Sequence, residues 1–239
     1  MNEVNGLTVK RSCSETVLQQ SGRPTIVGLT GGIGSGKSYI AQALAQRGYA
    51  VYDCDREAKR IIAENKEVQA AIIDLLGEEA FIYHQSSIIY NTSYVAKRVF
   101  EDPQLLESLN KIVHPAVKKD ICQQSGLSVK RSVSETVCQA KPVLFIESAI
   151  LFESGLDKLC DKIVVVTAPE ETRIARTIAR DYQGEATPEN INKVRARIHA
   201  QKEIPASTEV PQGRILTVIN DEASVLSGII DRISRFAAD

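Results

Sequence analysis

The chain has 239 residues and a mass of 26.2 kDa, enough for one large α/β domain or for one core with a sub-domain. Its 29 Lys and Arg residues balance 30 Asp and Glu residues, and the net charge of −1 disfavours a general nucleic-acid binder or a polybasic membrane binder. A hydrophobic fraction of 43% excludes disorder as the dominant state, and no apolar run approaches the ~18 residues of a membrane span.

The cysteines and the N-terminal residues indicate a compartment. None of the five Cys residues forms a C-x-x-C pair, which argues against a disulfide framework or a structural zinc site and fits a reducing environment. Residues 1–17 contain no apolar segment of the kind that a secretory signal requires. We therefore expect a cytoplasmic protein without a membrane partner.

Strands and helices are expected to alternate along the chain. The expected strands are Thr25–Thr30, Ala50–Asp53, Val143–Ile146, Ile163–Val166 and Ile215–Ile219. Four expected helices have both ends defined, namely Lys37–Arg47, Lys66–Leu76, 170–181 and 187–203. Two more are expected to begin at Asp55 and at Pro103, and a last one to end near Phe236. Residues 81–94 show a mixed pattern. Buried apolar strands between helices predict a doubly wound parallel α/β sheet with right-handed crossovers.

The order of these segments predicts the domain organisation. The helical block 55–124, between the second and third strands, is expected to form a substrate sub-domain over the carboxyl edge of the sheet. The charged helices of 171–203, with Gly184 as a hinge, are expected to form a lid. The nucleotide-binding core is expected to comprise 25–54, 141–170 and 204–239.

An internal repeat occupies two further segments. NGLTVKRSCSETVLQQ (5–20) matches SGLSVKRSVSETVCQA (125–140) at 11 of 16 positions. The first copy falls in an N-terminal extension, 1–24, and the second in an insertion, 125–140. Because each copy precedes an expected strand, we expect the two to pack together as strands or turns, away from the catalytic loops. Two independent flexible extensions, or a phosphate site on the Lys-Arg pairs, are the alternatives.

A glycine-rich segment follows the first expected strand and matches the phosphate-loop pattern G-x-x-x-x-G-K-[ST]. Glycines let backbone N–H groups approach phosphate oxygens, and the following helix N-terminus adds free donors. Lys37 is expected to reach the β- and γ-phosphates, and the Ser38 hydroxyl to ligate Mg²⁺. We therefore predict a site for ATP with Mg²⁺ at Gly31, Gly32, Ile33, Gly34, Ser35, Gly36, Lys37 and Ser38.

The phosphate loop alone does not distinguish kinases from GTPases or mechanical ATPases. No guanine-reading N-K-x-D motif occurs, and the D-x-x-G match that ends at Gly77 is better explained as a helix C-cap. A mechanical ATPase needs an apolar strand that ends in an acidic residue. Glu147 after VLFI is the nearest candidate, and it would either orient Mg²⁺ through water or only end the strand.

An acidic pair follows the second expected strand. Asp53 and Asp55 lie in VYDCD, at the strand end that faces the ligand crevice of an open α/β sheet. Phosphoryl transfer to a hydroxyl needs a carboxylate that orients the acceptor oxygen and takes its proton. Asp55 can fill that role, or it can be only the N-cap of the next helix.

Basic residues in the later helices suggest phosphate contacts. Arg173, Arg176 and Arg180 are three and four residues apart and share one helix face. Planar guanidinium groups suit bidentate phosphate binding, as in a lid over ATP, although a solvated, salt-bridged helix pair is the alternative. His114-Pro115 is expected to break or kink the long helix. His114 itself is either structural or part of an acceptor site.

Taken together, these motifs resemble the dephospho-CoA kinase family, whose members complete coenzyme A synthesis. The similarity covers about residues 25–237, and the D-x-D, LxHP-like and ES-x-LLFE-like segments are more specific than the phosphate loop. The matching segments are IVGLTGGIGSGKS, VYDCD, VFEDP, LNKIVHPAV, FIESAILFESG, DKIVVVTAP, RIARTIARD, RIHAQ and VIND. The resemblance implies an ATP-dependent kinase of the phosphate-loop type, with a helical CoA domain and a lid.

The resemblance also implies roles for individual residues. Asp55 would be the catalytic carboxylate that faces the ribose 3′-hydroxyl of dephospho-CoA, and Asp53 would support it. His114 would lie in the CoA-binding helical domain. The donor side would comprise Lys37 and Ser38 on ATP and Mg²⁺, the lid arginines Arg176 and Arg180 on the phosphates, and Asn220 near adenine.

The chain departs from the family pattern at two places. Lys59 stands where the family has Arg in its D-A-D-x-x-A-R segment, with Arg60 next to it, and Thr92 stands at another family Arg position. Lysine does not replace the bidentate Arg fork, and this puts some acceptor-phosphate contacts in question. A kinase that acts on a nucleoside or nucleotide, and a non-catalytic nucleotide-binding module, are the alternative functions. The oligomeric state is left open.

Overall fold

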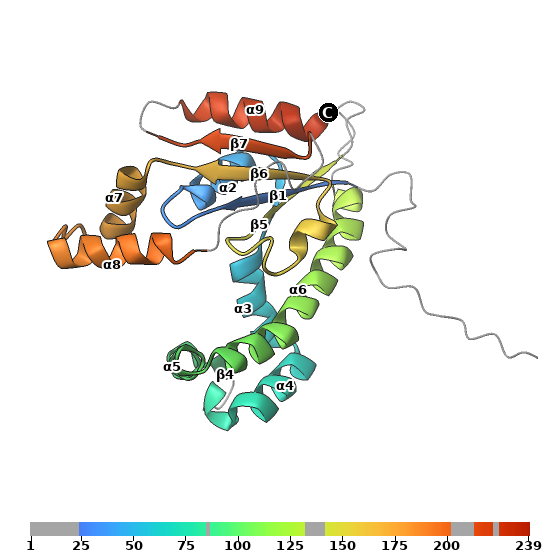
Figure 1. Cartoon of the computed structure of the whole chain (residues 1–239). Coiled ribbons are helices and arrows are strands. Elements are labelled where there is room, and N and C mark those ends of the chain that lie inside the picture. Colours follow the sequence, from blue (N-terminus) through green and yellow to red (C-terminus); the bar gives the residue numbers. More distant parts are fainter. Residues whose placement is uncertain (1–23, 85–86, 132–141, 202–212, 222–224) are drawn as a thin grey trace, which may run out of the picture.

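The computed structural model describes residues 24–84, 87–131, 142–201, 213–221 and 225–239. Its centre is a five-stranded sheet with the strand order β2-β5-β1-β6-β7, in which all pairs are parallel (Figure 1). The strands are β1 (Thr25–Gly31), β2 (Ala50–Asp53), β5 (Val143–Glu147), β6 (Lys162–Thr167) and β7 (Ile215–Ile219). The prediction of a doubly wound parallel α/β sheet is confirmed.

Alternation along the strands gives the sheet two apolar faces. Successive side chains of a strand point to opposite faces, so continuous apolar runs supply both. One face contributes Val27, Leu29, Phe145, Val164 and Val166. The opposite face contributes Ile26, Tyr52, Leu144, Ile146, Ile163 and Val165. Each face therefore needs its own helical cover.

Two helices cover the first face. α2 (Lys37–Gln46) follows the phosphate loop, and α9 (Leu226–Ala238) packs beside it against β1 and β7 (Figure 1). Ile40 and Leu44 of α2, and Ile230 and Ile233 of α9, are almost fully buried in this core. This packing fixes the start of α2 against the sheet and therefore the position of the phosphate loop.

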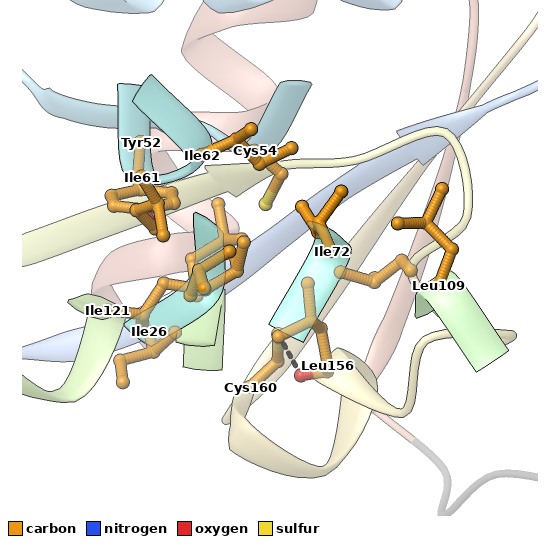
Figure 2. Close-up of a cluster of buried hydrophobic side chains, with 14 of the residues drawn as sticks. Ile26, Tyr52, Cys54, Ile61, Ile62, Ile72, Leu109, Ile121, Leu156 and Cys160 are labelled. Carbon is orange, nitrogen blue, oxygen red and sulfur yellow. Dashed lines mark hydrogen bonds between the residues drawn. The ribbon is translucent and has the colours of Figure 1, made fainter. Parts of the chain in front are cut away.

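A helical sub-domain adjoins the other face. It contains α3 (Cys54–Glu64), α4 (Lys66–Leu76), the hairpin of β3 (Phe81–His84) and β4 (Ser87–Tyr90), α5 (Thr92–Glu101) and α6 (Pro103–Arg131), with short 3₁₀ turns η2 (Glu78–Ala80) and η3 (Leu156–Leu159). The hairpin lies in the stretch of mixed pattern, 81–94. Figure 2 shows the shared core, in which Tyr52, Ile61, Ile62, Ile72, Ile121 and Leu156 converge from several of these elements.

One half-buried carboxylate ties the sub-domain to the sheet. Asp120 on α6 accepts hydrogen bonds from the Tyr52 hydroxyl of β2 at 2.8 Å and from Arg60 of α3 at 2.8 Å. Gln124, one turn further along α6, donates to the same oxygen at 3.0 Å. Burial and this contact raise the pKa of Tyr52, so the phenol stays protonated and acts as the donor.

The long helix differs from its prediction at Pro115. The prediction was a break or a kink. The break is wrong, because α6 continues as one helix from Pro103 to Arg131 with Pro115 inside it, and the kink stays a prediction. Proline removes one backbone donor and crowds the preceding turn, but packing of α6 on α3, α4 and α5 outweighs that cost. Gly77, by contrast, ends α4 as predicted, with a positive φ of 90°.

The segment predicted to be a lid forms a pair of helices at one end of the sheet. α7 (Glu170–Asp181) and α8 (Pro188–His199) pack through a small core of their own (Figure 1). Ile174 and Ile178 of α7 meet Val194 and Ile198 of α8 there, and Ile33 of the phosphate loop packs against them. The helix pair is therefore attached directly to the phosphate loop.

The repeat lies mostly outside the described residues. Copy 1 (5–20) falls there completely, and so does 132–140 of copy 2, so the expected packing of the two copies is not tested. The part of copy 2 up to Arg131 continues α6 as helix, where strands or turns were expected. None of the described helices combines the length and apolar character that crossing a membrane requires.

The core predicts how the sub-domain loses stability. Ile72 of α4 is fully buried, whereas Ile89 of β4 is 48% exposed. We expect Ile72→Ala to lower the free energy of unfolding by ~2–5 kcal/mol, because the deletion leaves a cavity between packed helices. Ile89→Ala, the matched control, is expected to change it by less than about 1 kcal/mol. Urea unfolding followed by circular dichroism measures both, and equal losses would contradict this picture of the core.

Candidate active site

The phosphate loop adopts the conformation that its glycines predict. Gly34 and Gly36 have positive φ values of 74° and 85°, which L side chains rarely adopt. A Cβ atom at Gly34 would collide with the backbone of Arg173, and one at Gly36 with the amide of Asn220. The loop therefore needs glycine both for its backbone angles and for close packing on its neighbours. α2 begins directly after Gly36, and the first N–H groups of a helix have no partner within it.

Side chains from the lid end of the molecule fix the outer part of the loop. The Arg173 Nε donates to the Ile33 carbonyl at 2.8 Å. The Gln201 amide oxygen accepts from the Ile33 N–H at 2.7 Å and from Arg173 at 3.1 Å. These bonds use backbone groups of Ile33, so Ile33 is not one of the loop positions that is open to phosphate in this conformation.

The part of the loop around Ser35 is held by Asn220 and Arg176. The Asn220 amide donates to the Ser35 carbonyl at 2.9 Å, and Arg176 donates to the Asn220 carbonyl at 3.0 Å and to the Ser35 carbonyl at 3.3 Å. Asn220, at the carboxyl end of β7, is 6% exposed. Its predicted place near adenine stays a prediction, and its observed contact is with the phosphate loop.

The two polar side chains that end the loop, those of Lys37 and Ser38, meet at one carboxylate oxygen. Glu147, the last residue of β5, is 7% exposed, and its Oε1 accepts from the Lys37 ammonium at 2.6 Å and from the Ser38 hydroxyl at 2.7 Å. β5 pairs directly with β1, which brings the end of one strand beside the loop that follows the other. Because the Ser38 hydroxyl gives its only hydrogen to Glu147, its lone pairs remain available to a cation.

The two aspartates after β2 have separate positions. The Asp53 carboxylate accepts from the backbone N–H groups of Asp55 and Arg56, both at 3.0 Å, and is the N-cap of α3. The interpretation of Asp55 as the cap is therefore wrong. The Asp55 side chain is exposed and lies in the first turn of α3.

A cavity of about 320 Å³ lies over the phosphate loop. It brings together the three residues predicted to be catalytic, Lys37, Asp55 and Arg180, with the predicted lid residue Arg176. Its other lining residues are Gly31, Gly32, Ile33, Gly34, Ser35, Gly36, Ser38, Tyr39, Ala149, Thr177 and Gln201. Every residue of the predicted phosphate loop thus lines this cavity.

A second cavity, of about 230 Å³, opens on the helical sub-domain. Asp55 lines this cavity as well, whereas Asp53 lines neither. His114 is among its lining residues, and burial lowers the pKa of its imidazole, which is therefore neutral near pH 7. Cys54 also lines it, and burial raises the pKa of that thiol to about 12, so the thiol is protonated and unreactive.

The lid arginine is held at the edge of the first cavity. Arg180 pairs with the neighbouring Asp181 at 2.7 Å, and its side chain is 63% exposed. Arg197 of α8 pairs with the same carboxylate at 2.9 Å. Arg180 and Arg197 together lower the pKa of Asp181 to about 2. An exposed ion pair of this kind contributes little free energy, so it holds Arg180 only weakly.

The loop fits a phosphate ligand and a cation that the ligand brings with it. The Ser35 hydroxyl is buried and lacks a hydrogen-bond partner among the described residues. Within the same residues, no cluster of three or more His, Cys, Asp and Glu side chains forms a complete metal site. Mg²⁺ commonly takes one or two protein oxygens and completes its shell with phosphate and water, and the Ser38 hydroxyl beside Glu147 suits that arrangement.

Sequence analysis missed part of this site. It weighed Glu147 but left its role open, and it gave no role to Gln201 or to the carbonyl contact of Arg173. An acidic residue at the end of an apolar strand was the available signal for Glu147. No comparable signal existed for Gln201, because a single glutamine after a charged helix carries no pattern. The chain has Lys59 at a position where the family has Arg, and Arg60 is next to it. In the structure, Arg60 forms ion pairs with Glu57, Glu64 and Asp120.

The Lys37–Glu147 pair predicts a test by unfolding. The Lys37 and Glu147 side chains are 11% and 8% exposed. We expect Glu147→Ala to lower the free energy of unfolding by ~3–5 kcal/mol, because it leaves a buried ammonium without its partner. Adding Lys37→Met to that variant should restore part of the loss. Urea unfolding of the four proteins in the cycle measures the coupling, and strictly additive losses would contradict the pair.

The control for this cycle is an exposed pair on the lid. Lys193 and Glu189 are in contact at 2.6 Å, but their side chains are 56% and 75% exposed. Glu189→Ala is expected to leave the free energy of unfolding nearly unchanged, since water screens such pairs.

Comparison with known proteins identifies the family. A family model described as dephospho-CoA kinase matches residues 25–212. The chain is 38% identical over 158 residues to the dephospho-CoA kinase of Chlorobaculum tepidum, covering 66% of this chain and 72% of the relative. It is 41% identical over 155 residues to the enzyme of Porphyromonas gingivalis, covering 65% and 69%.

Solved structures agree with the fold. A crystal structure from Thermus thermophilus has a TM-score of 0.60 at 30% identity. The match covers 89% of this chain and 95% of the chain in that structure. The dephospho-CoA kinase from Campylobacter jejuni has a TM-score of 0.53 at 17% identity, with coverages of 89% and 96%, and supports the fold alone. On the family match and the level of identity to its relatives, the chain belongs to the dephospho-CoA kinase family.

Proposed function

We propose that the chain transfers the γ-phosphoryl group of ATP to the ribose 3′-hydroxyl of dephospho-CoA and releases coenzyme A and ADP. One observation carries the assignment of roles, namely that Asp55 lines both the cavity over the phosphate loop and the cavity on the helical sub-domain. A carboxylate at the junction of two cavities can contact a donor in one and an acceptor in the other. Phosphoryl transfer requires a group in that position.

The donor phosphates bind over the loop. Free N–H groups at the start of α2 point to the β- and γ-phosphates, and the Lys37 ammonium exchanges its contact with Glu147 for phosphate oxygens. Ser38 would hold Mg²⁺, which supplies charge neutralisation between the β- and γ-phosphates. Arg176 and Arg180 line the same cavity from α7 and stabilise the charge that develops on the transferring group.

The acceptor hydroxyl binds at Asp55. The ionised carboxylate accepts the hydrogen of the 3′-hydroxyl, which orients that oxygen toward the γ-phosphorus. A new bond forms between the 3′ oxygen and phosphorus, and the bond from phosphorus to the bridging oxygen of ADP breaks. The proton of the hydroxyl passes to Asp55, and ADP leaves with the electron pair. Asp53 supports this geometry through the start of α3.

The alternative functions are separated by one assay. Comparing ATP consumption with dephospho-CoA against nucleoside and nucleotide acceptors distinguishes this enzyme from a nucleoside or nucleotide kinase. ATP binding without transfer to any acceptor would indicate a non-catalytic module. A cytoplasmic location and the absence of a nucleic-acid partner remain predictions from composition.

Separate substitutions of the two aspartates test the catalytic assignment. Asp55→Asn should lower kcat by about 10²–10⁴-fold, because the amide cannot take the proton, while ATP affinity and stability stay near wild type. Asp53→Ala, the matched variant, should cost ~1 kcal/mol of stability through loss of the cap. Steady-state kinetics and urea unfolding measure both effects. Full turnover in Asp55→Asn would rule out Asp55 as the base.

The lid arginine gives a second test. Arg180→Ala should lower kcat/KM for ATP by about 10-fold to 100-fold, because it removes a charged hydrogen bond to phosphate, and it should leave dephospho-CoA binding nearly unchanged. Arg195→Ala is the control, since Arg195 lies on the lid but pairs with Glu170 and does not line the cavity. Titration of both substrates measures the difference, and a selective loss of acceptor affinity would contradict the assignment.

A further inference from the structure

The side-chain amide of Gln201 is fixed against the phosphate loop by two donors. Its oxygen accepts from the Ile33 N–H at 2.7 Å and from the Arg173 Nη2 at 3.1 Å. Arg173 is held in turn, because its Nε donates to the Ile33 carbonyl at 2.8 Å. A backbone N–H and a guanidinium can only donate, so the oxygen end of the amide faces both of them. The Nε2 end of the amide is therefore turned away from Arg173.

Glycine at position 32 leaves the space for this arrangement. A Cβ atom at Gly32 would lie 2.9 Å from the Gln201 Oε1 and would also collide with the Arg173 guanidinium, so a larger residue would displace the pair. Ile33 adds a further attachment, because its side chain packs in the apolar core that α7 and α8 share. Gln201, two residues after the end of α8, is thus held beside the loop by contacts that do not use its Nε2.

Gln201 lies at the boundary of two cavities. One is the cavity of about 320 Å³ over the phosphate loop, which Lys37, Asp55 and Arg180 also line. The other, of about 470 Å³, adjoins the loop and is lined by Arg173. Arg173 does not line the first cavity, whereas Gln201 lines both. Because the Gln201 oxygen is turned to Arg173, Nε2 is the polar atom that this side chain offers to a ligand over the loop.

The Gln201 amide nitrogen is a donor without a partner among the described residues. The two bonds that this half-buried side chain makes there both end at its oxygen. By accepting from the Ile33 N–H, Gln201 covers one backbone donor of the loop and leaves its own N–H groups in that place. The backbone N–H groups of a phosphate loop cradle mainly the inner phosphates, so the γ-phosphoryl group depends more on side-chain donors. Gln201 supplies one such donor in the cavity that Asp55 lines.

We propose that Gln201 donates a hydrogen bond from Nε2 to a γ-phosphoryl oxygen of ATP and is a further catalytic residue of the transfer. The inference rests on the proposed function, since it takes ATP as the phosphoryl donor. During transfer, charge is spread over the three non-bridging oxygens of the phosphoryl group, and a donor that is already fixed stabilises one of them without reorganising. Arg173 acts through Gln201 and is a positioning residue, because it holds the amide in the orientation that the contact requires.

Nucleotides with and without a γ-phosphate test the contact. Calorimetric titration compares ADP with the β,γ-methylene analogue of ATP, both in the presence of Mg²⁺. Gln201→Met keeps the length of the side chain but removes its amide. We expect this variant to weaken binding of the analogue about 10-fold more than binding of ADP, because only the analogue has the γ-phosphate that Nε2 contacts. Equal losses for the two nucleotides would mean that Gln201 acts through the loop alone, and they would overturn the proposal.

Replacement by glutamate separates the donor from the support of the loop. Gln201→Glu keeps an oxygen for the Ile33 N–H and for Arg173, but it replaces the Nε2 donor with an acceptor. We expect kcat with dephospho-CoA to fall about 10²-fold, as when a donor to developing charge is removed. The melting temperature should stay at the wild-type value or rise, because Arg173 then pairs with a carboxylate. Gln201→Met, which loses both functions, should lower kcat and the melting temperature together. Wild-type kcat in Gln201→Glu would contradict the donor role.

Gln104→Glu is the matched control for the added charge. Gln104 is exposed on α6 and lines neither cavity, so kcat and both nucleotide affinities should stay at their wild-type values. The outcomes also distinguish this inference from the proposed function. If wild type phosphorylates dephospho-CoA and Gln201→Glu does so equally fast, the role of Gln201 is overturned and the proposed function stands. If wild type transfers no phosphoryl group to dephospho-CoA, the proposed function fails, whereas the titrations with ADP and the ATP analogue still decide whether Gln201 contacts the γ-phosphate.

Discussion

The parallel pairing of β1 with β5 on one side and β6 on the other determines the site. Parallel strands carry their carboxyl ends to one edge of a sheet, and β1 is the central strand. The loop after β1 therefore lies between the end of β5, which supplies Glu147, and the end of β6, which leads into the lid. The β2–β5 pairing adds the start of α3 to the same edge. Residues from distant parts of the chain meet there because of strand order alone.

Glu147 links stability to ligand binding. In this conformation it neutralises Lys37 and fixes the Ser38 hydroxyl, so the two polar side chains at the end of the phosphate loop are held in place. A buried ammonium needs a counter-charge, and phosphate oxygens can replace the carboxylate in that role. Arg176 and Asn220 both donate to the Ser35 carbonyl and so hold the loop backbone next to Lys37.

Much of the fold could be predicted from the sequence, and for identifiable reasons. Continuous apolar strands and glycine or proline boundaries are local signals, and all five strands of the sheet lie where such signals place them. The phosphate loop is equally local. The continuity of α6 through Pro115 is different, because tertiary packing overrides a local preference there. Strands β3 and β4 also lack a clear alternation, since Ile82, Tyr83, Ile88 and Ile89 are all exposed, whereas Phe81 is buried.

The site could be predicted only in part. Side chains that belong to the phosphate loop were identified by spacing, but their partners depend on which strands become neighbours. Glu147 becomes the partner of Lys37 through the β1–β5 register, and Gln201 reaches Ile33 through the fold of the lid. Asp53 and Asp55 differ by two positions, and only the path of the backbone at the start of α3 shows which of them is the cap. Sequence spacing contains no information of this kind.

The contacts of Asp120 have a mechanical consequence. They join β2, α3 and α6, so the strand that leads to Asp55 and the helix that carries His114 are tied to the sheet through one carboxylate. The helix pair α7–α8 is instead attached to the phosphate loop, through the hydrogen bonds of Arg173 and Gln201 to Ile33 and of Arg176 to Ser35. The residues that border the two cavities are thus joined to the sheet in different ways. Asp55 and His114 belong to elements that share the Asp120 carboxylate, whereas Arg176 and Arg180 belong to a helix that is bonded to the phosphate loop.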